Sequence, residues 1–152
     1  MRELNELADE LDVTVSWHSG TTMERALEGC GGLFIPNREH IVLRRGMSAW
    51  KQVVVLAHEL GHALEWRSFD GKARKTNSAI MACVNMEMGI GGEFPAPVSD
   101  VLFDYAMERE RVAWDSCDEL LQELEVPGAP AVVRKMSRDA REAYARILRR
   151  EV

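Results

Sequence analysis

Residues 53–64 read VVVLAHELGHAL, and this stretch indicates both the fold and the candidate site. Its apolar positions predict a helix from about Ser48 to Trp66, with Ser48 as the N-cap. The apolar run before the first histidine makes this helix largely buried. Only a narrow stripe of its surface therefore stays polar, and the two histidines lie in that stripe.

The pattern His58-Glu59-x-x-His62 places two imidazoles one helical turn apart on the same face. At that spacing both reach one tetrahedral Zn²⁺ at about 2.0–2.1 Å. Glu59 lies about 100° round the helix from His58, so its carboxylate stands beside the metal without binding it and can accept a proton from metal-bound water. The alternative is a solvated stripe formed by Lys51, both histidines and Glu65. The buried run before the motif favours the metal.

A second helix, predicted from Ser99 to about Leu124, offers two candidates for the third ligand, Glu108 and Glu110. They lie about 200° apart on the helix, so only one can face the metal. Glu108 continues a polar stripe, whereas Glu110 falls in the middle of the apolar face. A carboxylate there is costly unless it is paired or binds metal. Glu110 is the predicted third ligand, and its alternative is a buried pair with an arginine.

The remaining elements predict an α+β fold, mostly helical, with a small β-sheet packed on the helix of residues 48–66. Short strands are expected where apolar residues alternate or cluster, and glycines and prolines interrupt residues 67–100. The expected elements are a helix at 2–11, strands at 13–17, Leu33–Ile35 and Ile41–Leu43, a turn at Pro36-Asn37, a short helix near 78–88, and a helical tail from 131.

The chain of 152 residues suits one main domain, expected over 1–126, followed by a linker at 127–130 and a basic helical tail over 131–152. With 25 acidic and 19 basic residues the net charge is −6, which argues against a general nucleic-acid binder and leaves only the basic tail for such contacts. No apolar run approaches the length of a membrane span, and the charged N-terminus lacks a signal-peptide core. We expect a cytoplasmic protein without membrane contact.

The motif and the later glutamate together resemble the gluzincin type of zinc metallopeptidase. A closer resemblance is to ImmA/IrrE-type metallopeptidases, which have two strands, a helix bearing AHELGHAL and a helix bearing a Glu-x-x-Ala motif. Here the two strands precede Ala57–Leu64, and Glu110-Arg111-Val112-Ala113 follows. The resemblance spans roughly residues 1–120. It implies a zincin-like domain that cleaves peptide bonds of a protein substrate, such as a transcriptional repressor of a phage or mobile element.

By this resemblance His58, His62 and Glu110 bind zinc, and Glu59 is the catalytic base. Related enzymes often carry Asp or Asn four residues after the ligand glutamate, where it steadies a ligand histidine. This chain has Trp114 there, and an indole N–H only donates, so another group has to steady the histidine.

Two questions stay open in the sequence. The group that stabilises the oxyanion can be His18, His40, Tyr105 or a nearby arginine. The second question is function, because a zincin fold can also serve as a metal-binding regulatory or interaction module with little or no peptidase activity. The presence of Glu59 favours the enzyme, since such a module has no need of a base.

Overall fold

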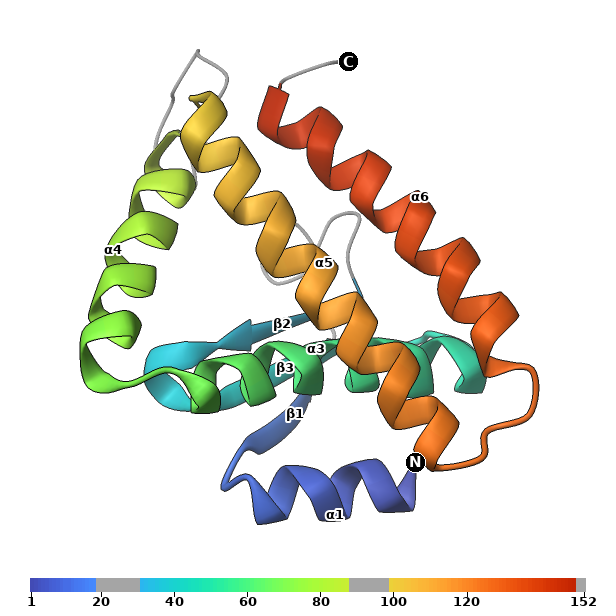
Figure 1. Ribbon diagram of the computed structural model, residues 1–152. Coiled ribbons are helices and arrows are strands. Elements are labelled where there is room, and N and C mark those ends of the chain that lie inside the picture. The colour runs from blue at the N-terminus through green and yellow to red at the C-terminus, as the bar shows by residue number, and fades with distance from the viewer. Residues whose placement is uncertain (19–30, 88–98, 150–152) are drawn as a thin grey trace.

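The computed structural model describes residues 1–18, 31–87 and 99–149 (Figure 1). Short helices and strands come first along the chain, and the longer helices follow. The elements are α1 (Arg2–Glu10), β1 (Thr14–His18), β2 (Gly32–Ile35), the 3₁₀ turn η1 (Pro36–Arg38), β3 (His40–Arg44), α3 (Ala49–Ser68), α4 (Gly71–Glu87), α5 (Asp100–Glu123) and α6 (Ala129–Arg149). The predicted α+β class, mostly helical with one small sheet, is confirmed.

The sheet has the strand order β1-β3-β2, with β3 in the middle. β1 runs parallel to β3, and β2 runs antiparallel to it. Side chains alternate between the two faces of a strand, so Ile41 and Leu43 of β3 enter the core while His40 lies on the opposite face. Because β3 is in the middle, β2 is an edge strand of the sheet that the described residues form.

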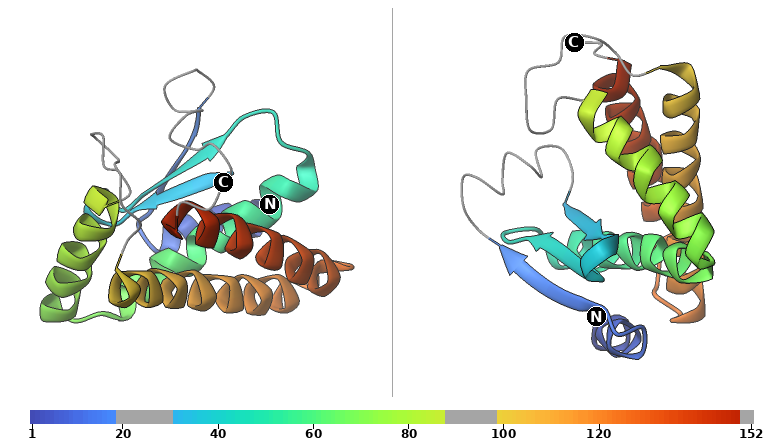
Figure 2. Two further views of the ribbon diagram at one scale, coloured as in Figure 1. Left: turned by 90° about the horizontal axis from the view of Figure 1, so that it is seen from above. Right: turned by 90° about the vertical axis from the view of Figure 1, so that its left-hand side faces the viewer.

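α3 is the central layer of the molecule, between the sheet and the pair formed by α5 and α6 (Figure 2). Ser48 caps it as predicted, because its side chain accepts from the backbone N–H of Lys51. The apolar run of its sequence explains the burial on several sides. The main core combines α1, the sheet, α3, α5 and α6, and its fully buried side chains include Leu4, Ile41, Leu43, Val54, Leu56, Leu60, Cys117 and Leu121.

The basic tail forms α6, which begins at Ala129 and packs along α5 (Figure 1). Ala129 and Val133 belong to the main core, and Leu148 forms a second apolar cluster with Ala106 of α5. The chain turns before α6 at Gly128, which has a φ of +74° that favours glycine. The apolar side of α6 is thus covered by the rest of the molecule. Arg134, Lys135, Arg138 and Arg146 are exposed, whereas Arg149 stands over the ring of Phe103 in α5.

α4 differs from the sequence prediction, because it begins at Gly71 and not near residue 78. Asp70-Gly71 was interpreted as a break, but the Asp70 carboxylate accepts from the backbone N–H of Ala73 at 2.7 Å and so caps the new helix. α3 has already ended at Ser68, so Asp70-Gly71 starts the next helix and does not interrupt one. Within the described residues, no helix is long and apolar enough to span a membrane.

Candidate metal centre

α3 and α5 bring together the three residues predicted as ligands. Nε2 of His58 lies 3.4 Å from one carboxylate oxygen of Glu110, and Nε2 of His62 lies 3.4 Å from the other. One potential ligand atom from each residue lies within 4.8 Å of those of the other two. The sequence analysis selected the same trio, and its role as a ligand set stays a prediction.

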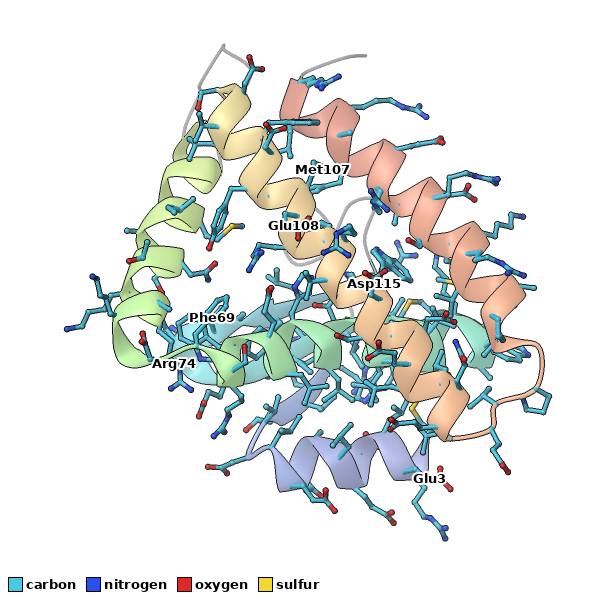
Figure 3. All side chains as sticks on the ribbon, viewed as in Figure 1. Glu3, Phe69, Arg74, Met107, Glu108 and Asp115 are labelled. Carbon is cyan, nitrogen blue, oxygen red and sulfur yellow. The ribbon has the colours of Figure 1, made fainter. Side chains whose placement is uncertain are left out.

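Glu108 lies elsewhere on α5, as its place in the polar stripe predicts. Its carboxylate accepts from Arg111 at 2.7 and 2.9 Å, and Arg111 also pairs with Asp115. Figure 3 shows Glu108 and Asp115 on α5. The alternative for Glu110, a buried pair with an arginine, is not what forms among the described residues, since the ion-pair partners of Glu110 there are the two histidines.

The three side chains fit a zinc ion on two counts. Two imidazoles and one carboxylate are a donor set found in catalytic zinc sites, where a fourth position stays open. Bond lengths of about 2.0–2.2 Å and tetrahedral angles require donor atoms about 3.4 Å apart. Each histidine nitrogen lies 3.4 Å from a different oxygen of Glu110. One ligand atom from each residue lies within 4.8 Å of the others, so the three donors would have to draw together to hold zinc.

The charges of the cluster are strongly coupled. Burial would lower the pKa of His62, but the hydrogen bond and the negative charge of Glu110 outweigh burial and raise it to about 9. Burial would raise the pKa of Glu110, yet the hydrogen bonds from His58 and His62 outweigh it and lower that pKa. The negative charge of Glu110 thus favours the charged form of His62 in the metal-free cluster.

Glu59 stands beside this cluster without joining it. The residue is 5% exposed, and its carboxylate accepts from the backbone N–H of Phe34 in β2. Burial raises the pKa of Glu59, while the charges of His58 and His62 lower it. The base predicted from the helical angle is thus within electrostatic reach of both histidines. The backbone donor that holds it could not be inferred from side-chain patterns.

Among the described strands β2 pairs with β3 alone, and Glu59 lies against Gly32 and Phe34 of this strand. The backbone N–H of Arg44 donates to the carbonyl of Gly31 at 2.8 Å, so this pair is hydrogen-bonded across the ladder. Bonded and non-bonded pairs alternate in an antiparallel ladder. In the observed register, Gly32 and Phe34 then turn their backbone groups away from β3. The bond from Phe34 to Glu59 is consistent with this geometry and shows which side of β2 lies nearest the base.

A second set of polar contacts joins α3 to α5 one turn from the ligands. Arg109 Nη1 lies 2.6 Å from Glu65 Oε1, and its guanidinium stands over the ring of Tyr105 at 5.1 Å. Tyr105 in turn donates to the side-chain oxygen of Asn77 in α4. α5 thus covers the part of the polar stripe of α3 that includes Glu65. The sequence analysis did not predict Arg109, because its partner becomes visible only when the helices are docked.

These contacts border an open pocket at the corner between α3, α4 and α5. It lies near Phe69, where α3 passes into α4 (Figure 3), and it is lined by Phe69, Asp70, Lys72, Ala73, Thr76, Asn77, Tyr105 and Arg109. Arg109, which pairs with Glu65, lines this pocket, whereas His58, His62 and Glu110 do not. Tyr105, a candidate for the oxyanion, points into this region and is hydrogen-bonded there.

The other two oxyanion candidates lie on the sheet. Nε2 of His40 lies 2.7 Å from the Ser16 hydroxyl, and Nε2 of His18 lies 3.0 Å from the same oxygen. Their strand positions put all three side chains on the face opposite to Ile41 and Leu43, which pack toward α3. Both histidines therefore lie on the wrong face of the sheet to stabilise charge at the cluster of His58, His62 and Glu110.

Comparison of this chain with protein-family models, curated proteins and solved structures finds no match.

Proposed function

We propose that this protein is a zinc-dependent metallopeptidase of the gluzincin type, in line with its resemblance to ImmA/IrrE-type enzymes. One observation carries the proposal. A His₂Glu cluster whose ligand atoms lie within 4.8 Å of one another stands beside a buried glutamate that is not part of it. Ligands alone would suit a structural metal, but a separate buried carboxylate is what general-base catalysis requires.

The residues divide the chemistry between them. His58, His62 and Glu110 hold the zinc ion, which supplies the charge that polarises a scissile carbonyl and acidifies water. Glu59 accepts a proton from the attacking water and returns it to the leaving amine. Burial raises the pKa of Glu59 and so favours the protonated form that the second step needs.

The edge of β2 supports a peptide as the substrate. An exposed strand edge binds an extended peptide by main-chain hydrogen bonds, as an added strand. Within the described residues β2 is paired on one side only, and Gly32 turns its backbone N–H and carbonyl to the unpaired side. The N–H of Phe34 on that side bonds to Glu59, so its carbonyl is the group left for a peptide. A peptide added there would run past the base. The resemblance extends the proposal to a cytoplasmic enzyme that cleaves a transcriptional repressor of a phage or mobile element.

The test compares Glu59→Gln with wild type on a library of peptides from a digested proteome. Wild type with zinc should generate new peptide termini, detected by mass spectrometry. Glu59→Gln should bind one equivalent of zinc and generate none. Glu108→Gln is the matched control, because it removes an exposed carboxylate. Equal cleavage by Glu59→Gln would remove Glu59 from the mechanism. Zinc binding without cleavage by any variant would favour the metal-binding regulatory module.

A further inference from the structure

α5 contributes a second side chain to the candidate centre, Trp114. It follows Glu110 by four residues, so both lie on the face of α5 that meets α3. The indole stacks on the imidazole of His58, with 4.2 Å between ring centroids and 27° between planes. Both residues are buried, with exposed fractions of 5% for Trp114 and 8% for His58. The contact is therefore closed to solvent.

His58 lacks the hydrogen bond that usually orients a ligand histidine. Its Nε2 faces Glu110, and its buried Nδ1 finds no hydrogen-bond partner among the described residues. A metal-binding histidine normally donates from its second nitrogen to a carboxylate, carbonyl or water, which fixes the ring plane. Trp114 cannot replace that acceptor, because the indole N–H only donates. Within the described residues, the contact of Nε2 with Glu110 and the ring contacts are what hold the plane of His58.

These contacts come from two directions. Trp114 lies flat against His58, and His62 meets the same ring edge-on, with 4.8 Å between centroids and 74° between planes. An imidazole confined in this way cannot rotate about its Cβ–Cγ bond without displacing one neighbour. Stacked and edge-to-face arrangements are the favoured geometries of aromatic pairs.

We propose that Trp114 is the positioning residue of His58, and that ring stacking takes the place of a hydrogen-bond acceptor in holding this ligand. The proposal rests on the metal centre of the proposed function. It also explains why α5 has to dock before the centre is complete, since one helix delivers both Glu110 and the ring that orients His58. Zinc affinity should then depend on an aromatic ring at position 114, beyond what stability alone requires.

The test measures zinc affinity by chelator competition for wild type, Trp114→Phe and Trp114→Leu. The phenyl ring retains the stack and should keep affinity within about threefold, whereas leucine should lower it by about 10–100-fold, the range typical for loss of a group that orients a ligand. Trp114→Met is the second non-aromatic variant, should the leucine variant not fold. Visible spectra of the cobalt-substituted proteins report the same difference as altered metal geometry.

Leu121→Ala is the control for loss of packing. Leu121 is fully buried on the same helix, about 10 Å further along it. It should lower the urea midpoint of the zinc-free protein without changing zinc affinity by more than about threefold. Equal affinities of Trp114→Phe and both non-aromatic variants would overturn the positioning role and leave the metal centre standing. Failure of wild type to bind zinc would overturn both, and absence of peptidase activity would affect neither affinity result.

Discussion

A Cβ atom on Gly61 would lie 2.5 Å from the carbonyl oxygen of Ala113 and 3.1 Å from its Cα atom. Both contacts are to the backbone of α5, which cannot move aside as a side chain can. Gly61 lies between the two histidines of α3, and Ala113 lies three residues after Glu110. The close approach of the two helices at this point is what brings the Glu110 carboxylate to the imidazoles.

Gly61→Ala should therefore separate α3 from α5. We expect the zinc-free protein to lose about 1–3 kcal/mol of unfolding free energy, because an added methyl overpacks a closed contact. Zinc affinity should fall as well, since Glu110 moves away with α5. Urea unfolding and chelator competition measure the two effects. Gly71→Ala is the control, because nothing lies within 4 Å of its added Cβ. A stable Gly61→Ala variant with normal zinc affinity would contradict the crossing as described.

Glu110→Ala should weaken zinc binding strongly, while Glu108→Ala should not. The first removes a carboxylate that both histidines contact, and the second removes an exposed partner of Arg111. Loss of an exposed pair changes stability by no more than about 1 kcal/mol. Both variants change the net charge equally, so chelator competition separates position from charge. Zinc release by Glu108→Ala alone would show that the third ligand is misassigned.

Zinc affinity should rise with pH up to about 9. The pKa of His62 is raised to about 9 in the metal-free protein, so below that pH the ring carries a proton that zinc has to displace. Each unit of pH in this range should change affinity by about tenfold for one displaced proton. Calorimetry in two buffers of different ionisation enthalpy counts the protons released. In Glu110→Ala the rise of zinc affinity with pH should occur at lower pH. A wild-type zinc affinity that does not change between pH 7 and 9 would refute the effect of Glu110 on the pKa of His62.

Gly32→Ala should impair hydrolysis while sparing metal binding. A Cβ there would lie 2.9 Å from Cγ of Glu59, 2.8 Å from a methyl of Val55 and 2.9 Å from one of Leu43. The neighbouring side chains have to shift, and Glu59 with them. Displacement of the catalytic base by about 1 Å can slow turnover by about 100-fold. Zinc affinity should stay at the wild-type value, and a variant with full activity would show that Glu59 tolerates the displacement.

Helices α3 and α5 could be predicted from sequence because each has long apolar periodicity and a serine at its N-cap position. Glu110 was selected for the same reason, as the acid that interrupts an apolar face. α4 was predicted too short, because Asp70-Gly71 can both end and begin a helix and local sequence does not decide between them. Here the bond from Ala73 to Asp70 decides it.

The remaining features depend on tertiary contacts between segments far apart in the chain. The bond from Phe34 to Glu59 involves a backbone group, which no side-chain pattern marks. The stack of Trp114 on His58 requires the crossing of two helices at a specific angle and height. The sequence showed that Trp114 could not accept a hydrogen bond from the histidine. It could not show that the face of the Trp114 indole would stack on His58.

Glu110 follows His62 by 48 positions, and all of α4 lies between them. A zinc ion bound by both helices closes a loop of that length, much as a covalent cross-link would. The entropy of closing a loop rises only slowly, by about 0.6 kcal/mol for each doubling of its length. Residues inserted into or removed from the middle of this loop would therefore hardly alter how firmly the ion is held. Zinc affinity should therefore be far less sensitive to the length of the segment between His62 and Glu110 than to the contact of α3 with α5.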